Sequence, residues 1–236
     1  MGVSASSRGT LQLPGIVCAA RARGQEVIAA KIAVIYYSAT GNVHKLANAI
    51  VEGALETGAE VRLRRVAELA PEEAIQQNQA WAAHRDETSG TVEEAEIEDL
   101  RWADGFAFGT PTRFGNPAAQ LKQFLDMAGG LWFEGALADK PVTTFTSAMY
   151  PEGGLESTIL ALNNVFYHWG CVLVPPGYTN PSIAEAGGNP YGASFASGEG
   201  PPSDAVLTAA RHQGRRLAAF TAIIAGAAIP ELAEAR

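Results

Sequence analysis

The chain has 236 residues, of which 47% are hydrophobic and 18% are charged, and its mean hydropathy is close to zero. These values are typical of a soluble globular protein that is long enough to bury one large core. The net charge of −8 argues against a nucleic-acid partner bound through a broad basic surface. No apolar run approaches the roughly 20 residues that a membrane span requires, so no span is predicted.

Disulfides and metal sites are also disfavoured. The two cysteines, Cys18 and Cys171, are too few for a disulfide framework, and the four histidines lack the spacing of metal ligands. We therefore predict no metal site and a reducing, cytoplasmic location.

Residues 1–30 differ in composition from the rest of the chain. They carry three arginines against Glu26 alone, and Pro14 and Gly15 interrupt their apolar stretch, which leaves no clean hydrophobic region of a signal peptide. We predict a disordered leader over 1–30, one domain over 31–228 and a C-terminal tail over 229–236.

Five short apolar runs alternate with helical patterns along the chain. Strands are predicted over 32–37, 60–65, 105–109, 141–147 and 171–174, and helices over about 42–57, 117–128, 155–169 and 203–225. This alternation indicates βαβ units and a parallel sheet covered on both faces. The expected fold class is a doubly wound, three-layer α/β/α domain, with the 60–65 strand near a sheet edge.

Two segments interrupt this alternation. Residues 71–98 are polar and acidic, with Trp81 as their main aromatic residue, and one irregular helix is predicted there. Residues 175–202 are rich in Gly, Pro, Asn and Ser and lack periodicity. A loop of that length is typical of a lid, a binding loop or an assembly surface.

In such a fold, ligands bind at the carboxyl ends of the strands, which directs attention to three loops. The loop after the first strand contains Ser38, Ala39, Thr40, Gly41, Asn42 and Val43. Its hydroxyls, its glycine and the unpaired N–H groups of the following helix suit a phosphate dianion. It matches neither a P-loop nor a dinucleotide fingerprint. Alone, it fits a flavin, a sugar phosphate or a plain helix cap.

The loop after the third strand contains a single charged residue, Arg113. Its candidate residues are Pro111, Thr112, Arg113, Phe114 and Gly115. Phe114 suits a contact along a planar ring, and Gly115 allows close backbone approach. Beside a redox-active ring, Arg113 would stabilise the negative charge that two-electron reduction produces. A surface loop with a solvated arginine is the alternative.

The loop after the fourth strand contains glycine and is suited to wrap a flat ligand. Its candidate residues are Ser147, Ala148, Met149, Tyr150, Pro151, Glu152 and Gly153. Taken alone it is weak support for a site, but the three loops together indicate one.

These residues carry a family resemblance. The chain resembles the WrbA-type NAD(P)H:quinone oxidoreductases of the flavodoxin-like superfamily. The matching segments include Gly109-Thr-Pro-Thr-Arg-Phe-Gly-Asn116, Gly129-Gly-Leu-Trp132, Gly177-Tyr178, Pro190-Tyr-Gly-Ala193 and Gln213-Gly214, and they extend over nearly all of 31–225. The first two are the most specific.

The resemblance implies a five-stranded flavodoxin-like sheet, FMN as cofactor, and NADH or NADPH as electron donor. It places the FMN phosphate at 38–43, the flavin ring against 111–114 and further contacts at 147–153. It also implies a quinone substrate that stacks near Trp132, alternating use of one site by donor and acceptor, and a homotetramer. Arg113 and Trp132 are the candidate catalytic residues.

The chain departs from the family at three places. Thr40 stands where the family has an aromatic residue placed to meet the nicotinamide. Trp169 replaces a histidine that approaches the flavin, and is therefore counted among the predicted cofactor contacts. The 147–152 loop is bulkier and one residue longer than its family counterpart. We therefore expect an FMN-dependent quinone reductase; the alternative is an electron-transfer or interaction protein that binds FMN without quinone turnover.

Overall fold

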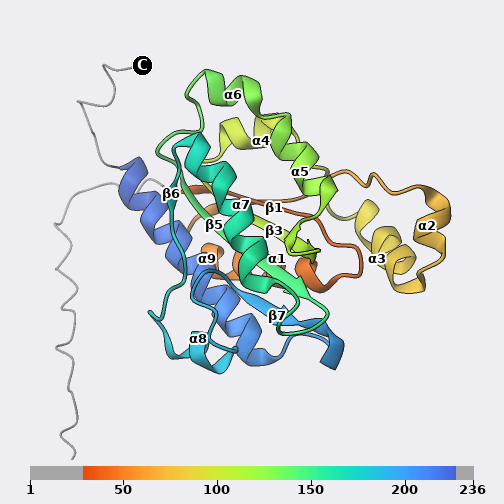
Figure 1. Ribbon diagram of the computed structural model, residues 1–236. Coiled ribbons are helices and arrows are strands. Elements are labelled where there is room, and N and C mark those ends of the chain that lie inside the picture. Colours follow the sequence, from red (N-terminus) through yellow and green to blue (C-terminus); the bar gives the residue numbers. More distant parts are fainter. Residues whose placement is uncertain (1–28, 227–236) are drawn as a thin grey trace, which may run out of the picture.

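A parallel sheet runs through the centre of the molecule (Figure 1). The computed structural model describes residues 29–226. In spatial order the main strands are β2 (Glu60–Arg65), β1 (Lys31–Tyr36), β3 (Gly105–Arg113), β5 (Pro141–Ala148) and β6 (Val172–Leu173). Neighbours along this path pair in parallel. The predicted doubly wound, flavodoxin-like fold is therefore confirmed.

Burial follows position in the sheet. β1, β3 and β5 lie in the middle and are almost completely buried, whereas every residue of β2 is at least partly exposed. The central strands are buried because helices cover both of their faces. The edge position of β2 agrees with the alternating character of its sequence.

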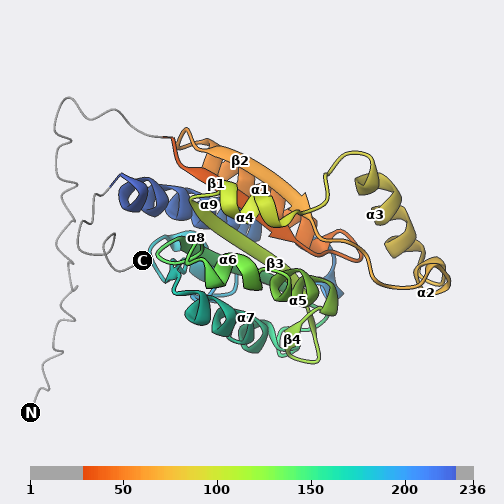
Figure 2. The same cartoon turned by 90° about the horizontal axis from the view of Figure 1, so that it is seen from above.

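Helices form a layer on each face of the sheet (Figure 2). One face is covered by α1 (Asn42–Leu55) and α9 (Asp204–Ala225), which bury residues such as Leu46 and Leu217. The other is covered by α5 (Ala119–Asp126) and α7 (Leu155–Trp169), with residues such as Phe124 and Phe166. The short helices α4 (Ile97–Trp102) and α6 (Gly129–Phe133) contribute to the same side.

The contact between α1 and α9 requires glycine. A Cβ added to Gly53 would lie 1.9 Å from the backbone oxygen of Arg211, and one added to Gly214 would lie 2.1 Å from that of Ile50. The two helices therefore approach backbone to backbone, which fixes the position of α1 and of the loop that precedes it.

The prediction of one irregular helix over 71–98 is wrong. This segment forms α2 (Glu72–Gln76) and α3 (Gln79–Ser89), and α4 begins at its end. The Asn78 side chain accepts hydrogen bonds from the backbone N–H groups of Ala80 and Trp81 and so begins α3 as a separate helix. Together, α2 and α3 project to one side of the sheet (Figure 1).

The partly buried carboxylate of Glu68 connects α3 to the central part of the domain. The Glu68 side chain accepts hydrogen bonds from the Tyr37 hydroxyl at 2.9 Å, the Trp81 indole at 2.9 Å and the Gln120 amide at 2.7 Å. It also accepts from the backbone N–H groups of residues 69 and 70. The end of β1, α3 and α5 are thereby held to one side chain.

The segment 175–202 also contains structure that its composition did not predict. It forms α8 (Pro181–Glu185), β7 (Ser194–Ala196) and a 3-10 helix, η1 (Ser197–Glu199). β7 pairs in parallel with the end of β5, beyond the two residues of β6. The buried Gln213 side chain accepts from the Ala193 N–H and donates to Thr143 and the Thr144 carbonyl. A strand and an amide network therefore attach this segment to the core.

β4 (Asn116–Pro117) pairs with the end of β3 in a short antiparallel hairpin, within a region predicted as a loop. Most of the predicted leader over 1–30, and the predicted tail over 229–236, lie outside the described residues. Across residues 29–226, no helix has the length and apolar character needed to span a bilayer.

Candidate functional site

The loops that follow β1, β3 and β5 meet at the carboxyl edge of the sheet, around a cavity of about 620 Å³. The register explains this meeting, since Tyr36 pairs with Gly109 and Pro111 pairs with Ser147, so the three strands end side by side. The volume is within the range of small-molecule and cofactor sites.

Most of the predicted cofactor contacts line this cavity. They are Ser38, Ala39, Thr40, Asn42 and Val43 from the first loop, Pro111, Thr112, Arg113 and Phe114 from the second, and Ser147, Ala148, Met149, Tyr150 and Gly153 from the third. Gly41 and Gly115 shape the turns between these residues. Pro151 and Glu152 instead line a neighbouring cavity of about 780 Å³, between the start of α7 and residues 185–203.

The first loop presents the N-terminus of α1 to the cavity. Gly41 precedes the helix in the left-handed region, at φ 85°, and no side chain caps the first turn. The Asn42 amide donates to the Thr40 hydroxyl at 3.3 Å, which holds both polar side chains at the entrance. Free N–H groups, two hydroxyls and the positive end of the helix dipole form a site for an anion.

The second loop is the tip of a tight hairpin. Arg113 pairs with Asn116, and the two residues between them, Phe114 and Gly115, have φ values of 53° and 76°. Both values are positive, as a type I′ turn requires, and a phenylalanine there is strained. The Phe114 side chain is fully exposed at the rim of the cavity. Strain at an exposed aromatic residue favours a functional role for it.

Arg113 is positioned for a ligand. Among the described residues its guanidinium makes one hydrogen bond, to the Thr112 carbonyl at 3.2 Å, and no ion pair. The Thr112 hydroxyl accepts from that of Thr158 on α7 at 2.6 Å, which holds the hairpin against the helix. The arrangement places an available positive charge on a supported loop.

The third loop is held by the segment after β7. The Ala148 carbonyl accepts from the Ser197 hydroxyl at 3.0 Å, and the Met149 carbonyl accepts from the Gly198 N–H at 2.8 Å. The side chains of Met149 and Tyr150 remain largely exposed on the cavity side. The backbone of this loop is therefore fixed, while its side chains are free to contact a ligand.

Two cavity residues were missed by sequence reasoning. Asn78, the first residue before α3, and Ser197, in η1, both line the cavity. The helix-capping signal of Asn78 was available in the sequence. The position of Ser197 depends on the pairing of β7 with β5, for which there was no local signal.

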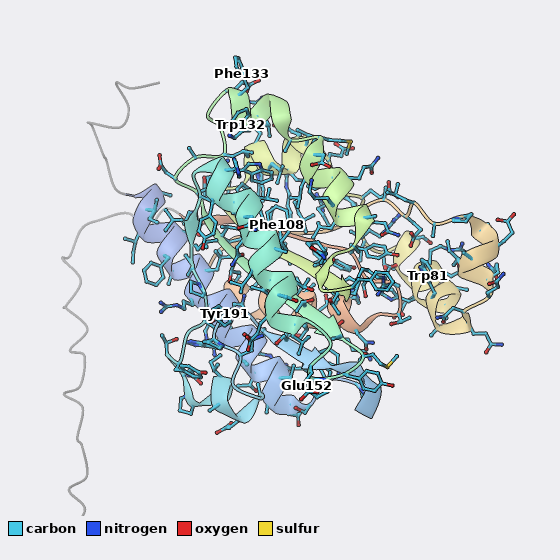
Figure 3. The ribbon with its side chains drawn as sticks, viewed as in Figure 1. Trp81, Phe108, Trp132, Phe133, Glu152 and Tyr191 are labelled. Atoms are coloured by element: carbon cyan, nitrogen blue, oxygen red, sulfur yellow. The ribbon has the colours of Figure 1, made fainter. Side chains whose placement is uncertain are left out.

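Besides Pro151 and Glu152, the two predicted tryptophans are not brought to this cavity. Trp132 and Trp169 line a separate pocket of about 260 Å³. Trp169 is buried and packs edge-on against Phe108 and Phe166. The reason is the course of α7, which starts at the cavity and carries its last residue about 20 Å away. Figure 3 shows Trp132 on α6 at one end of the molecule and Glu152 at the other.

Over residues 29–226, no cluster of three or more His, Cys, Asp or Glu side chains has metal-binding geometry. Burial raises the pKa of the Cys171 thiol to about 12, so this cysteine is unreactive near neutral pH.

Comparisons with known proteins agree with this architecture. Residues 30–185 match the family model described as NADPH-dependent FMN reductase. The chain is 42% identical over 196 residues to an NAD(P)H dehydrogenase (quinone) of Deinococcus radiodurans, covering 83% of this chain and 98% of the relative. A protein of the same name from Geotalea uraniireducens is 41% identical over 205 residues, covering 83% and 99%.

Two solved structures are similar in fold. A flavodoxin, WrbA-like protein from Agrobacterium tumefaciens superposes with a TM-score of 0.59 at 25% identity, covering 82% of this chain and 98% of that one. Oxidised flavodoxin 2 from Bacillus cereus superposes with a TM-score of 0.54 at 17% identity, covering 81% and 99%.

Proposed function

This chain belongs to the NADPH-dependent FMN reductase family, and from that membership we propose that it is an FMN-dependent NAD(P)H:quinone oxidoreductase. The WrbA-type resemblance drawn from the sequence is confirmed by the relatives and the WrbA-like neighbour. The proposed reaction consumes NADH or NADPH, a proton and a quinone, and yields the oxidised nucleotide and a hydroquinone. The observation that carries the proposal is the convergence of three loops on one cavity.

The residues around the cavity fit FMN in charge and shape. The N-terminus of α1 with Ser38, Thr40 and Asn42 would hold the phosphate through neutral donors. The loops at 111–114 and 147–150 would enclose the ring. When bound, FMN supplies two-electron redox chemistry that side chains lack.

Arg113 has an electrostatic role in this proposal. Its guanidinium has no carboxylate partner among the described residues, so its charge is available to the ring. A cation at that place stabilises negative charge on a reduced ring, which favours transfer of electrons in pairs. The exposed Met149 and Tyr150 would then limit the size of the substrate that reaches the ring.

The predicted role of Trp132 requires a second copy of the chain. Trp132 is half exposed and the neighbouring Phe133 is almost fully exposed, both on α6 and distant from the cavity of their own chain (Figure 3). We propose that a homotetramer brings Trp132 of one copy to the cavity of another, as a wall for the quinone. The cytoplasmic location stays a prediction.

An FMN protein without quinone turnover is the second candidate, and the third loop favours it. Met149, Tyr150 and the charge of Glu152 differ from the small residues of the family pattern; the first two line the cavity, and Glu152 lines the neighbouring one. Such a protein would still bind FMN.

Spectroscopy of the purified protein with FMN tests the proposal. We expect FMN to bind, its visible band to bleach under anaerobic conditions on addition of NADH or NADPH, and the band to return with benzoquinone. If FMN binds but neither nucleotide is oxidised with benzoquinone present, the second candidate is correct. If FMN does not bind, both are wrong.

A further inference from the structure

Two histidines lie behind the loop that joins β1 to α1. His84, on α3, is 7% exposed, and a Cβ added to Gly41 would lie 3.3 Å from its Nδ1. His44, in the first turn of α1, has its ring centroid 5.3 Å from that of His84. The pair therefore lies against the turn at the positive end of α1, and neither ring lines the cavity.

The two rings differ in their hydrogen bonds. His44 Nδ1 lies 2.5 Å from the Tyr36 hydroxyl, and its Nε2 lies 3.0 Å from the Asn48 amide. His84 differs: within residues 29–226, neither of its ring nitrogens makes a hydrogen bond, although its backbone carbonyl accepts one from the Thr88 hydroxyl at 2.8 Å. An imidazole without a protein hydrogen-bond partner among the described residues therefore lies against the anion-binding loop, and its nitrogens are free to take up a proton.

The charged groups around His84 are of both signs, so their effects on its pKa largely offset each other. The titratable and charged groups that face it are Tyr36, Tyr37, Arg65 and Glu68 from β1, β2 and the loop after β2, His44 and Lys45 from α1, and Arg85 and Glu87 from α3. Arg65 and Arg85 already pair with carboxylates, and Glu68 is fully engaged. Burial, followed by His44, therefore lowers the pKa of His84 to about 4.

We propose that His84 takes up a proton when a phosphate dianion binds at the loop, so that FMN affinity falls less on acidification than it would with a side chain that cannot be protonated at this position. The inference rests on the FMN site proposed above. A dianion separated from the imidazole by one turn of backbone, in a partly desolvated site, favours the imidazolium through Coulombic attraction. Because two imidazolium rings 5.3 Å apart repel each other, the His44–His84 pair takes up one proton.

This proposal makes His84 a positioning residue for the phosphate, because it touches the loop rather than the reacting ring. Binding of phosphate and binding of the proton strengthen each other by the same factor. If FMN moves the titration midpoint of His84 upward by about one pH unit, the protonated protein binds FMN about tenfold more tightly than the neutral one.

Calorimetry measures the proton directly. FMN is titrated into the wild type and His84→Asn at pH 5 in two buffers of different ionisation enthalpy, which counts the protons taken up on binding. The FMN phosphate titrates near pH 6 itself, equally in both proteins. We expect the wild type to take up a few tenths of a proton more than the variant. Riboflavin, which lacks the phosphate, should give no difference, and His212→Asn, on α9, should behave as the wild type.

NMR of the wild type with ¹³C-labelled histidine gives a second measurement that does not depend on the variant folding. We expect the midpoint of one imidazole to rise by about one pH unit when FMN is bound. If FMN binds but this midpoint does not move, and proton uptake is equal in wild type and variant, the inference is overturned while the proposed function stands. Failure of the wild type to bind FMN at any pH would instead overturn the proposed function.

Discussion

The two ends of the cavity are built differently. At the end proposed for the phosphate, called the phosphate end below, Gly41 and Val43 are buried, and β1, α1 and α3 pack closely around the loop. At the ring end, Phe114, Met149 and Tyr150 are exposed on loops whose backbones alone are fixed. Rigid packing suits a group that is always the same, the phosphate, whereas exposed side chains suit partners that alternate. We infer that affinity resides at the phosphate end and selectivity at the ring end.

Gly41→Ala tests the phosphate end and should have the largest effect. The substitution places a Cβ at φ 85°, a conformation strained for alanine, and 3.3 Å from the His84 ring. The loop must shift, so we expect FMN to bind at least about tenfold more weakly, a loss of about 1.4 kcal/mol or more. Gly58→Ala is the matched control, because Gly58 has φ 84° in open space away from the cavity. Equal FMN affinity in both variants would remove the distinction between the two ends.

Glu68→Gln tests whether α3 supports the phosphate end. An amide cannot accept all the hydrogen bonds that the carboxylate accepts from Tyr37, Trp81 and Gln120, so at least one donor loses its partner. We expect the free energy of unfolding at pH 7 to fall by about 1–2 kcal/mol, measured with urea. Glu73→Gln, on the exposed face of α2, should change it little.

The same variant has a predicted pH dependence. Burial alone would raise the pKa of Glu68, but hydrogen bonds from the Ala70 N–H, Gln120, Tyr37 and Trp81 outweigh it and lower the pKa. A carboxyl whose pKa is lower in the folded than in the unfolded state stabilises the fold above its ordinary pKa, and this contribution disappears on acidification. The difference between wild type and Glu68→Gln should thus be complete at pH 7 and shrink below about pH 4. A difference independent of pH would contradict the assignment.

The regular elements could be predicted from sequence because their patterns are local. The 155–169 helix has the predicted bounds, and the 60–65 strand has both its bounds and its edge position. Each contains a periodicity long enough to identify it. The convergence of the three loops followed from the rule that parallel strands share a carboxyl edge.

What could not be predicted depends on contacts between distant residues. α2 has five residues, too few for a helical period, and β7 is a strand because it pairs with β5, some 50 residues earlier. The placement of Trp132 and Trp169 was missed for another reason. A resemblance assigns a role to a residue without giving its place in the structure, and here the course of α7 carries Trp169 to a separate pocket, which Trp132 also lines.

Phe114→Asn tests the ring end. Its expected effect on the free energy of unfolding is the smallest of these variants, but whether that free energy rises or falls is informative. Asparagine tolerates positive φ and is favoured at the first position of a type I′ turn, whereas Phe114 is strained there at 53°. We expect the free energy of unfolding without FMN to rise by about 0.5–1 kcal/mol, measured with urea. Since the side chain is fully exposed, no packing is lost to offset this gain.

The same substitution should weaken FMN binding, because the aromatic surface at the rim of the cavity disappears. Phe114→Leu separates the two effects: it keeps the backbone strain, so it should bind FMN more weakly without gaining stability. If Phe114→Asn makes the protein more stable but weakens FMN binding, the backbone strain at residue 114 is kept because the phenylalanine side chain serves binding. If stability falls in Phe114→Asn, the side chain has a structural role instead, and the ring end is then as firmly built as the phosphate end.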